Sequence, residues 1–141
     1  MRAVLDTSVL VAAIRRNRGA SRELLRMVLD EEFKPLVSVP LVLEYEAVLT
    51  RSEHLIVSEF DKMTILGIVK TFCTLGEPVH IAHRLRPQLV DSDDEFVLEA
   101  AYHGKAEAII TLNTRDFLTA ADRFGISALL PGEALERMKR R

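Results

Sequence analysis

Side chains with carboxylate or amide oxygens occur in four separate segments of the chain, at the ends of expected strands or near the starts of expected helices. They are Asp6, Glu44, the run 91–95, and the pair formed by Asn113 and Asp116. Carboxylates crowded together repel one another, so such a cluster is costly unless a hard cation lies among them. Mg²⁺ or Mn²⁺ suits oxygen ligands and can lower the pKa of a bound water to make a nucleophile. These residue types therefore indicate metal-assisted phosphodiester hydrolysis.

Each of these acids also has a purely structural interpretation. Asp6 can be a helix cap, Glu44 a charge on a helix surface, and the run 91–95 a solvated loop with negative charge at a helix start. Asp116 with Asn113 can likewise cap a helix. The structural interpretations explain poorly why four such positions occur together at matching places in the expected fold.

Apolar periodicity predicts the elements that must position these side chains. Short apolar or β-branched runs predict strands at 2–5, 36–39, 79–81, 107–111 and 126–130. Helices are expected at 7–15, 21–29, 40–48, 95–103, between the last two strands, and at 131–141. The range 56–75 fits one long helix or two short ones, and 84–93 has the composition of a loop.

This alternation favours an α/β fold, a three-layer α/β/α sandwich with a central, mostly parallel sheet. A length of 141 residues suits a single domain over 1–141. In parallel sheets the binding crevice lies beyond the carboxyl ends of the strands. The acids fall at these ends, so we expect them to converge there.

The composition limits the partners of the chain. A formal net charge of -2 with 28% charged residues is not that of a polybasic nucleic-acid binder, although cations bound to an acidic site would neutralise part of it. Cys73 is the only cysteine, which excludes an internal disulfide and a cysteine zinc cage. No apolar run reaches the roughly 20 residues of a membrane helix. We therefore expect a cytoplasmic protein with no membrane contact.

Four segments, in this order, resemble the motifs of PIN domains. The first is 4–11, with Asp6 closing a strand; the second is 38–49, with Glu44; the third is 91–101; and the fourth is 109–117. The match covers nearly the whole chain. It is closest to the VapC-like group, the toxin components of toxin–antitoxin systems.

The resemblance implies a set of carboxylates that bind Mg²⁺ or Mn²⁺ and activate water: Asp6, Glu44, Asp94 and Asp116. Asp93 and Glu95 compete with Asp94 for the third position. Other members carry Asp where this chain has Asn113, so either Asp116 supplies the fourth carboxylate or a second metal is bound weakly. Ser8 either orients a metal-bound water or caps the first helix.

The leading hypothesis is thus a metal-dependent endoribonuclease, the toxin of a toxin–antitoxin pair. It implies an RNA substrate, a cognate antitoxin, and a homodimer or higher homo-oligomer. Candidate phosphate contacts are Arg15, Arg16 and Arg115. The alternative is a catalytically inactive PIN-like module that binds RNA or protein, supported by Asn113. A phosphatase or receiver domain fits poorly, because Asp6-Thr7-Ser8 lacks the second acid that those sites need.

Overall fold

Five short strands, each parallel to its neighbours, lie at the centre of the computed structural model. The structure describes residues 1–81 and 94–140, and only the backbone of Asp94, Ala120 and Ala121. One sheet has the order β1 (Ala3–Leu5), β4 (Ala108–Ile110), β5 (Ser127–Leu129). The other pairs β2 (Leu36–Val37) with β3 (Glu77–Pro78). Every residue of β1 and β4 is fully buried, as expected for parallel strands covered on both faces.

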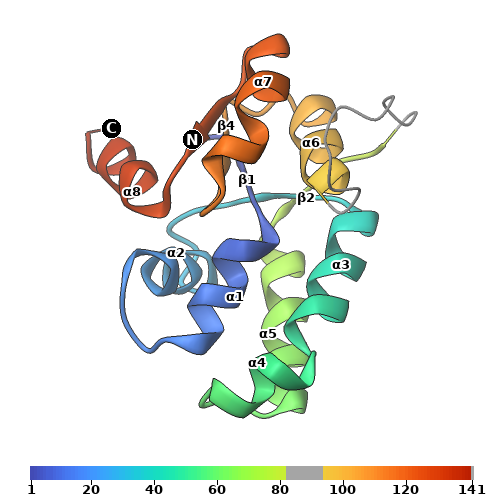
Figure 1. Cartoon of the computed structure of the whole chain (residues 1–141), viewed down its shortest axis with the longest axis vertical. Coiled ribbons are helices and arrows are strands. Elements are labelled where there is room, and N and C mark those ends of the chain that lie inside the picture. The colour runs from blue at the N-terminus through green and yellow to red at the C-terminus, as the bar shows by residue number, and fades with distance from the viewer. Residues whose placement is uncertain (82–93, 141) are drawn as a thin grey trace.

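Helices cover the strands from two sides (Figure 1). Below the strands in this view lie α1 (Thr7–Arg15), α2 (Ala20–Leu29), α3 (Val39–Leu49), α4 (Ser52–Val57) and α5 (Lys62–Leu75). On the other side lie α6 (Asp94–His103), to the right of β1 and β4 in this view, and α7 (Thr114–Arg123), which extends above them; α8 (Pro131–Lys139) packs against α2. The prediction of a three-layer α/β/α fold with a parallel sheet is confirmed.

The range 56–75 forms parts of two helices rather than one. α4 ends at Val57, and α5 begins after Asp61, whose Oδ1 accepts a hydrogen bond of 2.8 Å from the backbone N–H of Thr64. This N-cap satisfies a donor that the first turn of α5 leaves open. Gly67 lies inside α5 without ending it.

The strand expected at 79–81 lies two residues earlier, at Glu77–Pro78. Its register is set by β2, because the backbone N–H groups of Glu77 and Val79 donate to the carbonyls of Pro35 and Val37. Pro78 has no N–H to donate, which an edge strand tolerates. The loop expected at 84–93 lies outside the described residues.

The start of α3 fixes where Glu44 lies. Ser38 ends the β2 segment and caps the helix, its Oγ accepting a hydrogen bond of 3.3 Å from the backbone N–H of Leu41. Pro40 occupies the first turn, where a missing N–H costs nothing. Glu44 therefore lies one turn into α3, as the sequence predicts. Among the described helices, none combines the length and the apolar composition that crossing a membrane needs.

Candidate active site

Asp6 lies at the carboxyl end of β1 and is 4% exposed. It occupies the N-cap position of α1, but its side chain makes no capping hydrogen bond. Instead Oδ2 accepts two hydrogen bonds, one of 2.6 Å from Ser8 Oγ and one of 2.7 Å from Thr111 Oγ1. Oδ1 accepts none from the described residues. The two hydroxyls thus fix the carboxylate by one oxygen and leave the other available to a ligand.

Thr111 follows β4 directly and is fully buried. The pairing of β1 with β4 sets Leu5 beside Ile110, so the next step along both strands brings Thr111 to Asp6. Its Oγ1 also accepts a hydrogen bond of 2.9 Å from the backbone N–H of Asn113. Thr111 therefore joins the candidate first and fourth motifs. The sequence analysis gave it no role, although a polar residue directly after a buried strand is a usable signal.

Ser8 links the same two segments through a second path. Its Oγ donates to Asp6 and accepts a hydrogen bond of 3.2 Å from the backbone N–H of Leu112. These contacts do not include a capping hydrogen bond to the first turn of α1. Ser8 instead bridges Asp6 to the chain that leaves β4.

Glu44 is half-buried on α3, next to a residue that ties this helix to β1. That residue is Tyr45, whose buried hydroxyl donates a hydrogen bond of 2.5 Å to the carbonyl of Leu5. Burial, with smaller electrostatic contributions from Cys73 and Asp6, raises the pKa of Tyr45 well above its usual range. The phenol thus stays protonated and keeps donating. Glu44 is therefore next to Tyr45, which donates to the backbone of Leu5, the residue before Asp6.

The third predicted segment is described only from the start of α6. Asp93 lies outside the described residues, and Asp94 begins α6 with a side chain that is also outside them. Glu95 is 9% exposed and Glu99 is 5% exposed, so α6 carries two acids on a buried face. The sequence analysis treated Glu95 as a competitor for the third position and missed Glu99. The signal was available, since acids four residues apart share the face of a helix that also carries Leu98.

The fourth segment places its polar residues unequally. Asn113 and Asp116 are both exposed, and the backbone N–H of Asp116 donates to the Asn113 carbonyl at 3.0 Å. Asn113 is linked to Asp6 through Thr111, whereas no hydrogen bond or ion pair among the described residues links Asp116 to Asp6. Arg115 is exposed on the first turn of α7.

We call Asp6, Ser8 and Thr111 the Asp6 centre. An open groove of about 750 Å³ begins at Ser8 of this centre, while Asp6 and Thr111 do not line it. Ser8 and Asn113 line its near end, and Arg15, Arg16 and Arg18 line its far end at the connection from α1 to α2. Its walls between them are largely apolar, including Val11, Ala12, Leu112 and Leu130. Two of the arginines proposed from the sequence therefore lie in one groove with Ser8, and Arg115 does not line it.

The donors present fit a hard cation at one point. A buried carboxylate held by hydroxyls through one oxygen, with its second oxygen open, is a suitable ligand for Mg²⁺ or Mn²⁺. Within residues 1–81 and 94–140, no three acidic, histidine or cysteine side chains gather as a metal-binding group. Asp6 thus fits as one ligand, and the rest of the ligand set belongs to the proposal below.

Comparison with known proteins gives one match. A family model described as a PIN domain matches residues 2–115, which is most of the chain. No curated protein and no solved structure matches. PIN domains are commonly nucleases and typically use divalent metal ions. The chain, with Asp6 and Thr111 inside the matched range, therefore belongs to the PIN-domain family.

Proposed function

We propose that the chain is a Mg²⁺- or Mn²⁺-dependent endoribonuclease that hydrolyses RNA phosphodiester bonds, and that it acts as the toxin of a toxin–antitoxin pair. One observation carries the nuclease proposal. In a fold whose members are commonly nucleases, the first acid of the family pattern is buried at a strand end and oriented by two hydroxyls. A residue that served only as a helix cap would direct its side chain to the α1 backbone, and Asp6 does not.

Each candidate site residue would have a distinct role. Asp6, Glu44 and Asp94 would supply carboxylate oxygens for the cation, with Asp116 or Asn113 completing the set. Ser8 and Thr111 keep the Asp6 carboxylate in one orientation. A bound Mg²⁺ or Mn²⁺ would polarise the phosphate and acidify the attacking water.

Replacing the Asp6 carboxylate tests the proposal directly. We expect Asp6→Asn to lower Mn²⁺-dependent cleavage of a fluorophore–quencher RNA by at least about 100-fold, because an amide binds a hard cation far more weakly than a carboxylate. Wild-type cleavage should stop when EDTA is added. Circular dichroism of the variant should remain that of the wild type, because the amide keeps the shape of the side chain.

Asp122→Asn is the matched control, since Asp122 is an exposed acid near the end of α7 and makes no side-chain contact among the described residues. It should cleave RNA at the wild-type rate. EDTA-sensitive cleavage that persists in Asp6→Asn would rule out Asp6 as a ligand and contradict the assignment.

Asn113 supports a second candidate function, an inactive module that binds RNA or protein. An amide at this position, exposed beside Thr111, carries no charge for a second cation. Such a module would bind RNA equally well as wild type and as Asp6→Asn, and would cleave it in neither form. The cleavage assay above therefore separates the two functions.

The partners we propose are RNA, a cognate antitoxin and a second copy of the chain. The self-association proposal is supported by the end of α4 and the start of α5, where Ile56 is 81% exposed and Met63 is 75% exposed. Exposed apolar side chains of this size commonly mark protein contacts. The antitoxin proposal depends on the resemblance to the toxin group.

A further inference from the structure

The groove that leaves the Asp6 centre continues into a second hollow. This hollow has a volume of about 720 Å³ and shares Arg15, Arg16 and Arg18 with the groove. It reaches Val57 and Glu59, at the end of α4 and just after it. The three arginines thus lie where the two hollows join, and a chain-like ligand could run from Ser8 past all of them.

Two of these arginines have charges that nothing in the described protein neutralises. Arg16 and Arg18 are exposed, and neither side chain has a hydrogen bond or ion pair with a described residue. Arg26, by contrast, contacts Glu23, Asp30 and Glu32.

Arg22 stabilises the connection between α1 and α2, which carries Arg16 and Arg18. Its guanidinium donates to the backbone carbonyls of Ala13 at 3.0 Å and Arg16 at 2.6 Å, and it pairs with Glu59. It also lies over the ring of Phe60, 4.9 Å from the centroid. These contacts hold the end of α1 in place, so the unpaired arginines project from an ordered turn.

Arg15 also lines both hollows, and its side chain contacts a histidine. It lies 3.1 Å from Nδ1 of the buried His54, and because a guanidinium only donates, the imidazole accepts. Burial, helped by the positive charges of Arg15 and Arg51, lowers the pKa of His54 against the opposing effect of Glu53. A neutral imidazole orients Arg15 and leaves its charge for a ligand.

Between the arginines and Ser8, the surface of the groove is largely apolar. Leu112 is 45% exposed and Leu130 is 43% exposed, and both line the groove together with Val11. An apolar floor beside a cationic end suits a strand whose phosphates and base faces are both accessible. In a duplex the base faces are stacked inside, so a single strand fits this surface better.

We propose that this groove binds single-stranded RNA on one side of the scissile phosphodiester, with Arg16 and Arg18 contacting phosphates and Leu112 and Leu130 contacting bases. The inference rests on the proposed ribonuclease function and adds to it a substrate-binding groove, with named residues, outside the carboxylate site. The proposed path of the RNA runs from the Asp6 centre along α1 towards α4.

The test measures binding without cleavage, in an Asp6→Asn background. A short 5′-fluorescein RNA strand is titrated at several salt concentrations and followed by fluorescence anisotropy. We expect Arg16→Ala with Arg18→Ala to weaken binding at least about tenfold at low salt. The slope of log K against log salt should fall by about 1.4, since each phosphate contact to a single strand contributes about 0.7.

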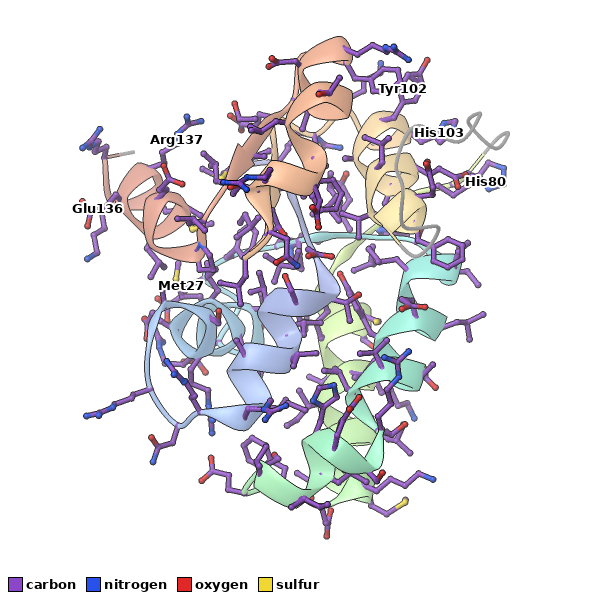
Figure 2. The ribbon with its side chains drawn as sticks, in the orientation of Figure 1. Met27, His80, Tyr102, His103, Glu136 and Arg137 are labelled. Atoms are coloured by element: carbon purple, nitrogen blue, oxygen red, sulfur yellow. The ribbon has the colours of Figure 1, made fainter. Side chains whose placement is uncertain are left out.

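Arg137→Ala is the matched control. Arg137 is an exposed arginine on α8 that has no side-chain partner among the described residues and does not line either hollow. Figure 2 shows it projecting outward from α8, away from the turn between α1 and α2. Its removal should leave both affinity and salt slope unchanged, and circular dichroism should confirm that all variants fold.

The outcomes separate this inference from the proposed function. If the wild type cleaves RNA but the double variant binds the single strand as tightly as its parent, the groove inference is overturned and the nuclease stands. Tighter binding of the same RNA paired with its complement would also overturn the single-strand inference. If the chain neither binds nor cleaves RNA, both proposals fail together.

Discussion

Thr111 is the residue that most directly determines how Asp6 is presented. Its Oγ1 donates one hydrogen bond to the Asp6 carboxylate and accepts another from the backbone of Asn113. Because the hydroxyl hydrogen is directed at Oδ2, the carboxylate has little freedom to rotate. Thr111 is thus a positioning residue that acts through Asp6.

Replacing Thr111 with valine should reduce activity without unfolding the protein. Val has nearly the same shape but donates no hydrogen bond, so Asp6 would be held by Ser8 alone. We expect the apparent affinity for Mn²⁺ or the cleavage rate to fall by about 10- to 100-fold, the usual effect of removing such a partner. The measurement is the rate of RNA cleavage against Mn²⁺ concentration.

Thr111→Ser restores a hydroxyl and should recover most of the loss, which a purely steric role would not explain. Thr74→Val provides the matched control, because Thr74 is an exposed residue of α5 whose hydroxyl donates to the Lys70 carbonyl. Wild-type metal dependence in Thr111→Val would show that the hydroxyl does not position Asp6.

At the scale of elements, α3 is fastened to β1 and α5 by one aromatic residue. Tyr45 donates to the Leu5 carbonyl, and its ring meets Phe72 of α5 edge-on, with centroids 5.7 Å apart. Edge-to-face pairs of this kind add to the stabilisation from burial. The strand that carries Asp6 and the helix that carries Glu44 are therefore joined at adjacent positions.

Tyr45→Phe should lower the free energy of unfolding by about 1–3 kcal/mol, since it leaves a buried carbonyl without this donor. Urea denaturation gives the value, and cleavage activity should fall because α3 would lose its register against β1. Tyr102→Phe is the control. Tyr102, at the end of α6 (Figure 2), is 39% exposed, and its hydroxyl makes no hydrogen bond with a described residue. An unchanged stability in Tyr45→Phe would contradict the anchoring role.

At the scale of the whole molecule, the parallel sheet brings distant segments to one edge. The ends of β1 and β4 are adjacent, so Asp6 and Thr111 meet although they are 105 positions apart. Helices on both sides bury these strands completely. A cation bound at this edge would therefore stabilise the entire fold rather than one loop.

Mn²⁺ should raise the melting temperature of the wild type by several degrees. A ligand present at a hundred times its Kd adds about 2.7 kcal/mol to the free energy of unfolding. Differential scanning fluorimetry should show this shift in the wild type and in Asp122→Asn, and lose it in Asp6→Asn. An equal shift in Asp6→Asn would mean that Mn²⁺ binds elsewhere, and no shift in the wild type would favour the inactive module.

The sequence by itself determined the kind of fold and the places of its candidate acids. Short apolar runs such as 2–5 and 107–111 are visible because a strand buried on both faces needs apolar residues throughout. Asp6 could be placed at a strand end and Glu44 one turn into a helix for the same local reason. The family resemblance came from segments that are each continuous in the chain.

Only the tertiary structure decided which side chains meet. The hydrogen bond from Thr111 to Asp6 depends on the register of β1 against β4. The groove depends on how α1, α8 and the end of β4 pack together. The sequence placed β3 two residues late, because its position is set by hydrogen bonds to β2 and not by its own composition. Periodicity in the sequence shows which face of a helix or strand is apolar. It does not show which other element that face will contact.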